Sequence, residues 1–194
     1  MPRSCHHGIK HFATNLITPN LKPQTANPKP QTSNLKYMEQ PIINEHNKAE
    51  YPPMHSAEHL LNGEMARRYK CGRAFSAHVE RKKSKLDYHL PQALTDAELR
   101  SLEDYVNSAI SADVEVTEEF ISQQEAMSRF DMSRLPEGAS ETVRVVHIGN
   151  YDQCLCAGTH VSKTSEIGTF RISSSRWQDG VQRIVFRLET ASIN

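Results

Sequence analysis

Two widely separated pairs of potential metal ligands constrain this chain more than any other feature. The first pair is His55 and His59, and the second is Cys156 and His160. The members of each pair are four residues apart, a spacing that places two side chains on one face of a helix. Imidazole and thiolate are ligands that zinc prefers, and four of them complete a tetrahedral set. The sequence therefore predicts a zinc site formed by these four side chains, with both pairs brought together by the fold.

The composition favours a cytoplasmic enzyme or binding domain. The formal net charge is zero and 37% of the residues are hydrophobic. No apolar run approaches the roughly 18 residues that a membrane-spanning helix needs. The N-terminal region also lacks the apolar stretch of a secretory signal. The four cysteines do not resemble a disulfide framework, and their use as metal ligands fits a reducing compartment better.

Residues 1–48 differ from the rest and are predicted to be disordered. They contain a quasi-repeat that reads NLKPQTA and then NPKPQTS. Its prolines lack the backbone N–H donors that a helix needs. A tract as polar as this one cannot bury enough apolar surface to offset the conformational entropy that folding would cost. We further hypothesise that translation begins at Met38 and that the preceding text is an over-called reading frame. Detection of peptides from residues 1–37 in the natively expressed protein by mass spectrometry would refute this.

Residues 51–190 predict one α+β domain, in which helices flank a largely antiparallel sheet. Helices are predicted at 54–70, after a capping box at Thr95–Glu98, and at 123–130. Residues 76–90 predict a hairpin whose connection reads ERKKSK. Further strands are predicted at 114–121, 141–148, 169–174 and 181–188, with the last two joined by residues 176–180.

The first pair has a rival interpretation. HSAEH also satisfies H-x-x-E-H, the motif of a zinc peptidase family in which Glu58 would be the general base. That motif needs a third, acidic ligand on another helix, for which Glu98, Glu103 and Glu118 are available. The peptidase hypothesis leaves the second pair without a role.

The second pair lies in a longer ordered pattern. C-x-G-T-H-V is followed by Glu166-Ile167-Gly168-x-Phe170-x-Ile172 and then by Gly180-Val181-x-Arg183-Ile184. Together with HSAEHLLN at the first pair, this pattern resembles the editing domain shared by alanyl-tRNA synthetases, threonyl-tRNA synthetases and freestanding AlaX proteins. The resemblance runs from about His55 to Leu188. Threonyl-type domains tend to carry proline where Thr159 stands, so the chain looks more like the alanyl side.

The resemblance implies hydrolysis of the ester between a wrong amino acid and the tRNA 3′ end. For AlaX-like proteins the expected substrate is serine, or glycine, on the alanine tRNA, with threonine tRNA as the other candidate. His55, His59, Cys156 and His160 match the family's zinc positions. The family has an acidic residue near Cys154, which here is either a spare ligand or a thiol on the opposite strand face.

Two further residues are candidates for contact with substrate. Thr159 lies between two predicted ligands, where its hydroxyl can touch the substrate or its methyl can pack. Asp87, on the hairpin arm, can orient water or substrate, and is equally plausible as a surface carboxylate. The sequence does not choose between a catalytic and a structural zinc. A tRNA-binding module without turnover therefore stays open beside the deacylase.

Basic clusters indicate an RNA partner despite the zero net charge, because local clusters make the electrostatic footprint. One cluster lies at the C-terminal end of the first predicted helix, and the other lies in the predicted hairpin connection. The residues predicted to bind tRNA are Arg68, Lys70, Arg73, Arg81, Lys82, Lys83, Lys85 and Arg183.

Overall fold

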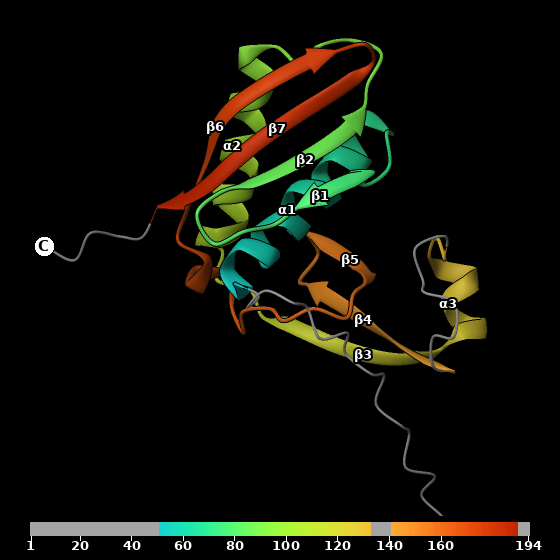
Figure 1. Cartoon of the computed structure of the whole chain (residues 1–194). Helices are drawn as coiled ribbons and strands as arrows, with labels where there is room; N and C mark the ends of the chain where they lie inside the picture. The colour runs from blue at the N-terminus through green and yellow to red at the C-terminus, as the bar shows by residue number, and fades with distance from the viewer. Residues whose placement is uncertain (1–50, 133–140, 190–194) are drawn as a thin grey trace, which may run out of the picture. The chain divides into compact units, whose positions relative to one another are not determined.

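The computed structural model describes residues 51–132 and 141–189, which form an α+β arrangement of two antiparallel sheets and three α-helices (Figure 1). This confirms the predicted fold class. The predicted disordered segment 1–48 and the hypothetical start at Met38 lie outside these residues. None of the helices in the described ranges is long and apolar enough to cross a bilayer.

The larger sheet has the strand order β1-β2-β7-β6. Its strands are β1 (Ser76–His78), β2 (Ser84–His89), β6 (Thr169–Gln178) and β7 (Val181–Glu189). β1 and β2 form the predicted hairpin, with Ala77 opposite Leu86. The predicted connection at 176–180 is wrong at its start, because β6 continues to Gln178. The turn is only Asp179–Gly180, and both residues have positive φ, as a two-residue hairpin loop requires.

The smaller sheet has the order β3-β4-β5. β3 (Val116–Ser122) and β4 (Thr142–Ile148) were predicted to within two residues, while β5 (Asp152–Leu155) was not predicted. α3 (Gln123–Arg129) follows β3 directly and covers a small second core around Val143 and Val145.

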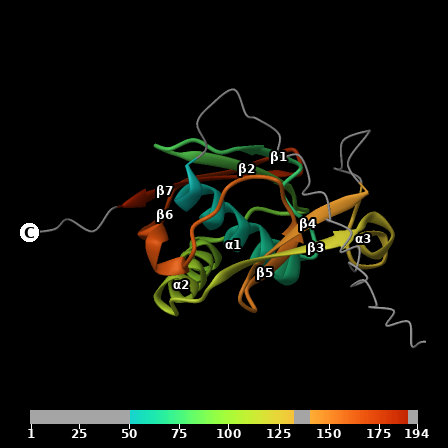
Figure 2. The ribbon, with the colours of Figure 1, turned by 90° about the horizontal axis from the view of Figure 1, so that it is seen from below.

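The two long helices lie against the inner face of the larger sheet, and α1 lies between that sheet and the smaller one (Figure 2). α1 (Pro52–Tyr69) begins at two prolines, whose fixed φ suits the first helical turn. α2 (Asp96–Ser111) begins at the predicted capping box, in which Thr95 and Glu98 satisfy each other's backbone donors. A short 3-10 helix, η1 (Thr164–Ile167), leads into β6.

One main core joins α1 and α2 to the larger sheet. It is lined by alternate residues of the strands and by one stripe of each helix, as their periodicities require. Its fully buried members include Met54, Leu61, Leu86, Tyr88, Leu102, Val106, Phe170, Ile184 and Phe186. This packing fixes α1 against the sheet, and α1 in turn carries half of the predicted metal ligands.

Candidate metal centre

α1 presents the first pair of predicted ligands as the sequence indicates. His55 and His59 are one turn apart, next to the stripe of Met54, Ala57 and Leu61 that packs into the core. His59 is consequently only 2% exposed, whereas His55 is partly accessible.

The second pair is not helical, contrary to what its spacing suggests. Cys156 and His160 lie in an irregular loop that follows β5. Arg144 of β4, only 7% exposed, holds this loop: its Nε donates to the Cys156 carbonyl at 2.8 Å and its Nη2 to the Gly158 carbonyl. Its Nη1 pairs with Glu118 at 2.7 Å. A buried guanidinium with planar, fixed donors is well suited to fixing backbone carbonyls that no strand partner satisfies.

The fold brings the two pairs together. Ligand atoms of His55, His59, Cys156 and His160 all lie within 4.8 Å of one another. The Cys156 Sγ is 3.5 Å from His55 Nε2 and 3.4 Å from His160 Nε2. The centroids of the three imidazole rings are 4.3 to 5.0 Å apart. This group of three nitrogens and one sulfur could hold a metal ion.

The remaining ring nitrogens test whether the group fits a metal. Nδ1 of His55 lies 3.2 Å from the Thr159 carbonyl, and Nδ1 of His160 lies 3.1 Å from Ser56 Oγ. Nδ1 of His59 lies 3.2 Å from the Asp152 carboxylate. Metal-binding histidines characteristically make such a contact with the nitrogen that does not face the metal. Each imidazole here is oriented in that way, so the donor set fits a metal ion.

The electrostatics of the group favour the anionic form of Cys156. Burial alone raises the pKa of its thiol, but contacts with His160, His55 and His59 outweigh burial and lower the pKa to about 2. Burial lowers the pKa of His160 to about 4, which keeps that imidazole neutral. Burial lowers the pKa values of His55 and His59, but contacts of His55 with Cys156, and of His59 with Cys154 and Asp152, outweigh burial and raise both, so a metal ion competes with protons at these two imidazoles.

Asp152 is a residue that the sequence analysis missed. It is 6% exposed and lies between His59 and Arg73, whose guanidinium binds both carboxylate oxygens at 2.8 and 2.9 Å. Burial raises its pKa, yet the hydrogen bonds from His59 and Arg73 bring the pKa down to about 2. Gly63 makes room for it, because a Cβ at that position would stand 2.5 Å from Asp152 Oδ1.

Cys154 belongs beside the centre rather than on the opposite strand face. Its Sγ lies 3.3 Å from His59 Nδ1, and His59, Asp152 and Cys154 form a second close group. Asp152, Cys154 and Cys156 alternate along β5 and its continuation, which puts the first two on one strand face. The D-x-C-x-C spacing is the sequence signal that could have identified Asp152.

The two candidate substrate-contacting residues lie in different places. Thr159 is exposed at the centre and its carbonyl orients His55. Asp87 is not brought to the centre. It alternates with Leu86 and Tyr88, which pack in the core with α1, so it lies on the outer face of the sheet. There it forms a two-bond ion pair with Arg183, at 2.7 Å for each bond.

The residues predicted to bind tRNA do not form one surface. Arg73 is bound to Asp152, and Arg68 is paired with Glu64 at 2.6 Å. Lys70 ends α1 in a left-handed conformation. The others lie on the hairpin connection or the outer face of the larger sheet: Arg81, Lys82, Lys83, Lys85 and Arg183.

The carboxylates that a zinc peptidase would need as a third ligand are elsewhere. Glu98 caps α2, Glu103 binds Arg171, and Glu118 binds Arg144. Glu58 itself is buried and accepts a hydrogen bond from Asn62, which also accepts from the backbone of residue 74. This arrangement gives Glu58 a structural contact on α1.

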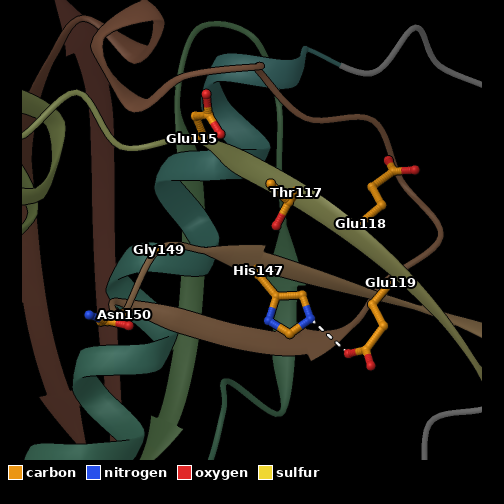
Figure 3. A pocket seen from close by; sticks show the side chains of 7 residues that line it. All are labelled: Glu115, Thr117, Glu118, Glu119, His147, Gly149 and Asn150. Carbon is orange, nitrogen blue, oxygen red and sulfur yellow. Dashed lines mark hydrogen bonds and ion pairs between the residues drawn. The ribbon is translucent and has the colours of Figure 1, made fainter.

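A separate open pocket lies on the smaller sheet (Figure 3). Three carboxylates line it, Glu115, Glu118 and Glu119, and Glu119 contacts His147 at 3.0 Å. None of the four histidine and cysteine ligands lines this pocket. Two of these carboxylates are already paired with arginines, Glu118 with Arg144 and Glu119 with Arg129.

Comparisons with known proteins relate the sequence of this chain to a family model and to curated proteins. Residues 143–185, which include Cys156 and His160, match the "Threonyl and Alanyl tRNA synthetase second additional domain". Over 142 residues, 70% of this chain, it is 38% identical to an alanine–tRNA ligase of Neisseria meningitidis serogroup B (strain ATCC BAA-335 / MC58). It is 34% identical over the same length to an alanine–tRNA ligase of Neisseria gonorrhoeae (strain ATCC 700825 / FA 1090). The chain spans about 15% of the length of these curated relatives. The resemblance predicted from the sequence is confirmed.

Proposed function

We propose that this protein is a zinc-dependent deacylase that hydrolyses the ester bond of mischarged tRNA. The proposed substrate is Ser-tRNA(Ala), with Gly-tRNA(Ala) as the next candidate. The observation that carries the proposal is the convergence of three imidazoles and one thiolate in a chain that resembles alanine–tRNA ligases. The proposed editing domain comprises residues 51–190. Its location is proposed to be cytoplasmic, where aminoacylated tRNA is used.

The proposed zinc ligands are His55, His59, Cys156 and His160. Zinc bound by them would supply a fixed positive charge that lowers the pKa of bound water or polarises an ester carbonyl. The chain's own contribution is orientation. Contacts with Thr159, Ser56 and Asp152 hold the three imidazole rings, so little reorganisation remains when a substrate enters.

Thr159 is the residue proposed to touch the substrate. It is exposed beside the centre, while its backbone is fixed by the hydrogen bond to His55. A hydroxyl in this position can hydrogen-bond the serine hydroxyl, which alanine lacks. A site built to hydrogen-bond a substrate hydroxyl discriminates strongly against the analogue without it. Asp87 is not proposed as a catalytic residue, because its carboxylate is bound to Arg183 on the outer face of the sheet.

The test is deacylation of Ser-tRNA(Ala) by the purified full chain, with Ala-tRNA(Ala) and Ser-tRNA(Thr) alongside and zinc measured in the same sample. We expect rapid loss of serine from the alanine tRNA alone and about one zinc per chain. Loss from the threonine tRNA instead would keep the enzyme class and overturn the tRNA assignment. Stable esters in all three samples would refute the deacylase.

A tRNA-binding module with a structural zinc is the second candidate. The observation that favours it is the presence of four protein ligands, because structural zinc sites are closed by four ligands and catalytic sites keep an open position. Full zinc content and tRNA binding without turnover would support this candidate over the deacylase.

A further inference from the structure

The outer face of the larger sheet, which points away from α1 and α2, is basic. No helix or strand in the described ranges lies over it (Figure 1, Figure 2). We call five of the cations on this face and the adjoining hairpin connection the basic face: Lys82, Lys83, Lys85, Arg176 and Arg183.

The cations at the middle of the sheet outnumber their counter-ions. Asp87 is bound by Arg183, and its pKa is lowered by that hydrogen bond first, with Lys85 and Arg176 adding to the effect. Neither Lys85 nor Arg176 is within ion-pair distance of a carboxylate in the part of the chain that the structure describes. Three cations therefore share one carboxylate, which is itself only 7% exposed.

Two pairs of arginines also face each other across β6 and β7. Arg176 is opposite Arg183, and Arg171 is opposite Arg187. Like charges directly opposite on neighbouring strands destabilise a sheet. Glu103 and Glu189 neutralise the second pair, whereas the first pair has only Asp87. An anionic ligand at the first pair would remove this repulsion.

The basic face is continuous with the metal centre around the start of α1. Arg81 of the hairpin connection stacks on the Tyr51 ring, with its guanidinium carbon 4.9 Å from the ring centroid. Tyr51 caps α1 one turn before His55. Lys82 and Lys83 follow Arg81 in the hairpin connection, and Lys85, Arg183 and Arg176 extend the series across β2, β7 and β6. A small anion cannot contact this whole series, but an extended polyanion can.

An aromatic pair lies on the same side of the sheet. Phe75 is 47% exposed and stacks on His89, with the ring centroids 4.1 Å apart and the planes 10° from parallel. Exposed stacked rings next to cations are the combination that nucleic-acid surfaces use, because bases stack on rings and phosphates pair with cations. The smaller sheet differs in its charged side chains, because its pocket is lined by carboxylates (Figure 3).

We propose that the basic face binds the phosphate backbone of the tRNA whose aminoacylated 3′ end occupies the metal centre. This inference rests on the proposed function and identifies the surface with which the protein would hold its tRNA substrate. It also divides the eight basic residues predicted from the sequence. Lys82, Lys83, Lys85 and Arg183 contact RNA, and Arg176 joins them, whereas Arg68 and Arg73 are paired with Glu64 and Asp152. Lys70 ends α1 and Arg81 stacks on Tyr51.

The test compares two variants of the full chain with equal reductions in positive charge. The first combines K82Q, K83Q and R176Q. The matched control combines R100Q, R129Q and K163Q, which lie on α2, on α3 and beside η1. Binding of uncharged alanine tRNA is measured by fluorescence anisotropy over a series of salt concentrations. Zinc content and thermal unfolding show that each variant is folded.

We expect the basic-face variant to bind tRNA at least about tenfold more weakly at low salt, and its salt slope to fall by roughly 0.7–0.9 for each phosphate that it no longer neutralises. The control should bind like the wild type within about twofold, because its charges are not near the proposed path. Equally weakened binding in both variants, or undiminished binding in both, would overturn the proposal. Binding of the wild type to anionic lipid vesicles but not to tRNA would also overturn it.

The outcomes separate this inference from the proposed function. Undiminished tRNA binding by the basic-face variant, together with deacylation by the wild type, would refute the surface and keep the enzyme. Weakened binding by that variant, with stable esters in the wild type, would keep the surface and refute the deacylase.

Discussion

Replacing Asp152 with asparagine tests whether the buried Arg73–Asp152–His59 contacts stabilise the centre. The carboxylate has an ordinary pKa of 3.8 and a pKa of about 2 in the folded protein. Because one pKa unit corresponds to about 1.4 kcal/mol, this difference stabilises the folded state by about 2 kcal/mol when the carboxylate is charged. Asparagine keeps the shape and one hydrogen-bond acceptor but leaves the Arg73 guanidinium without its counter-charge.

The dependence on pH follows from the sign of the shift. A lowered folded-state pKa stabilises the protein fully above about pH 4, and this contribution disappears as the pH falls toward 2. Urea unfolding of the wild type and D152N, in the presence of a chelator, should therefore differ by about 2 kcal/mol at pH 7. The difference should shrink between pH 4 and pH 2. D104N, at an exposed position of α2, is the control and should stay within about 0.5 kcal/mol of the wild type.

The same variant tests the orientation of His59. Asparagine cannot supply the negative charge that His59 Nδ1 contacts at 3.2 Å, so we expect zinc affinity to fall by about 10- to 100-fold. A stability difference below about 0.5 kcal/mol at pH 7, or one that does not change with pH, would refute this account of the centre.

Three further predictions follow from the centre and its surroundings. E58Q should leave the deacylation rate within about threefold of the wild type, because Glu58 has a structural contact on α1. Complete loss of deacylation would show that Glu58 takes part in the reaction, and peptide cleavage by the wild type that E58Q abolishes would favour the peptidase hypothesis. G63A should cost about 1–3 kcal/mol of stability in thermal or urea unfolding, since its Cβ would stand 2.5 Å from Asp152 Oδ1; unchanged stability would mean that β5 can move away from α1. Zinc affinity, measured by competition with a chelator, should fall by roughly tenfold per pH unit below neutrality for each proton displaced. The reason is that contacts with Cys154 and Asp152 raise the pKa of His59 despite its burial, so a proton competes with the metal ion for this imidazole. A zinc affinity that does not change between pH 8 and pH 6 would contradict this prediction.

Local sequence signals determined much of this fold. The prolines that begin α1, the capping box of α2 and the alternation in β2 and β7 each depend on residues within a few positions of one another. Such short-range patterns carry the geometry of single elements, so they predict helices and strands without knowledge of the partner elements. The four predicted ligands stood out in the sequence, because two pairs of imidazole or thiol side chains at this spacing seldom occur together by chance.

The tertiary structure alone decided which side chains serve the centre and which face solvent. Arg73 and Asp152 are 79 residues apart and form an ion pair, which leaves Arg73 outside the surface proposed to bind RNA. Asp87 lies between Leu86 and Tyr88 in β2, and successive residues of a strand point to opposite faces of the sheet. Because Leu86 and Tyr88 pack in the core with α1, Asp87 lies on the outer face. The Cys156 loop takes its form from Arg144 of the neighbouring strand rather than from helical spacing. Contacts of this kind depend on which elements pack together, and no local pattern in the chain encodes them.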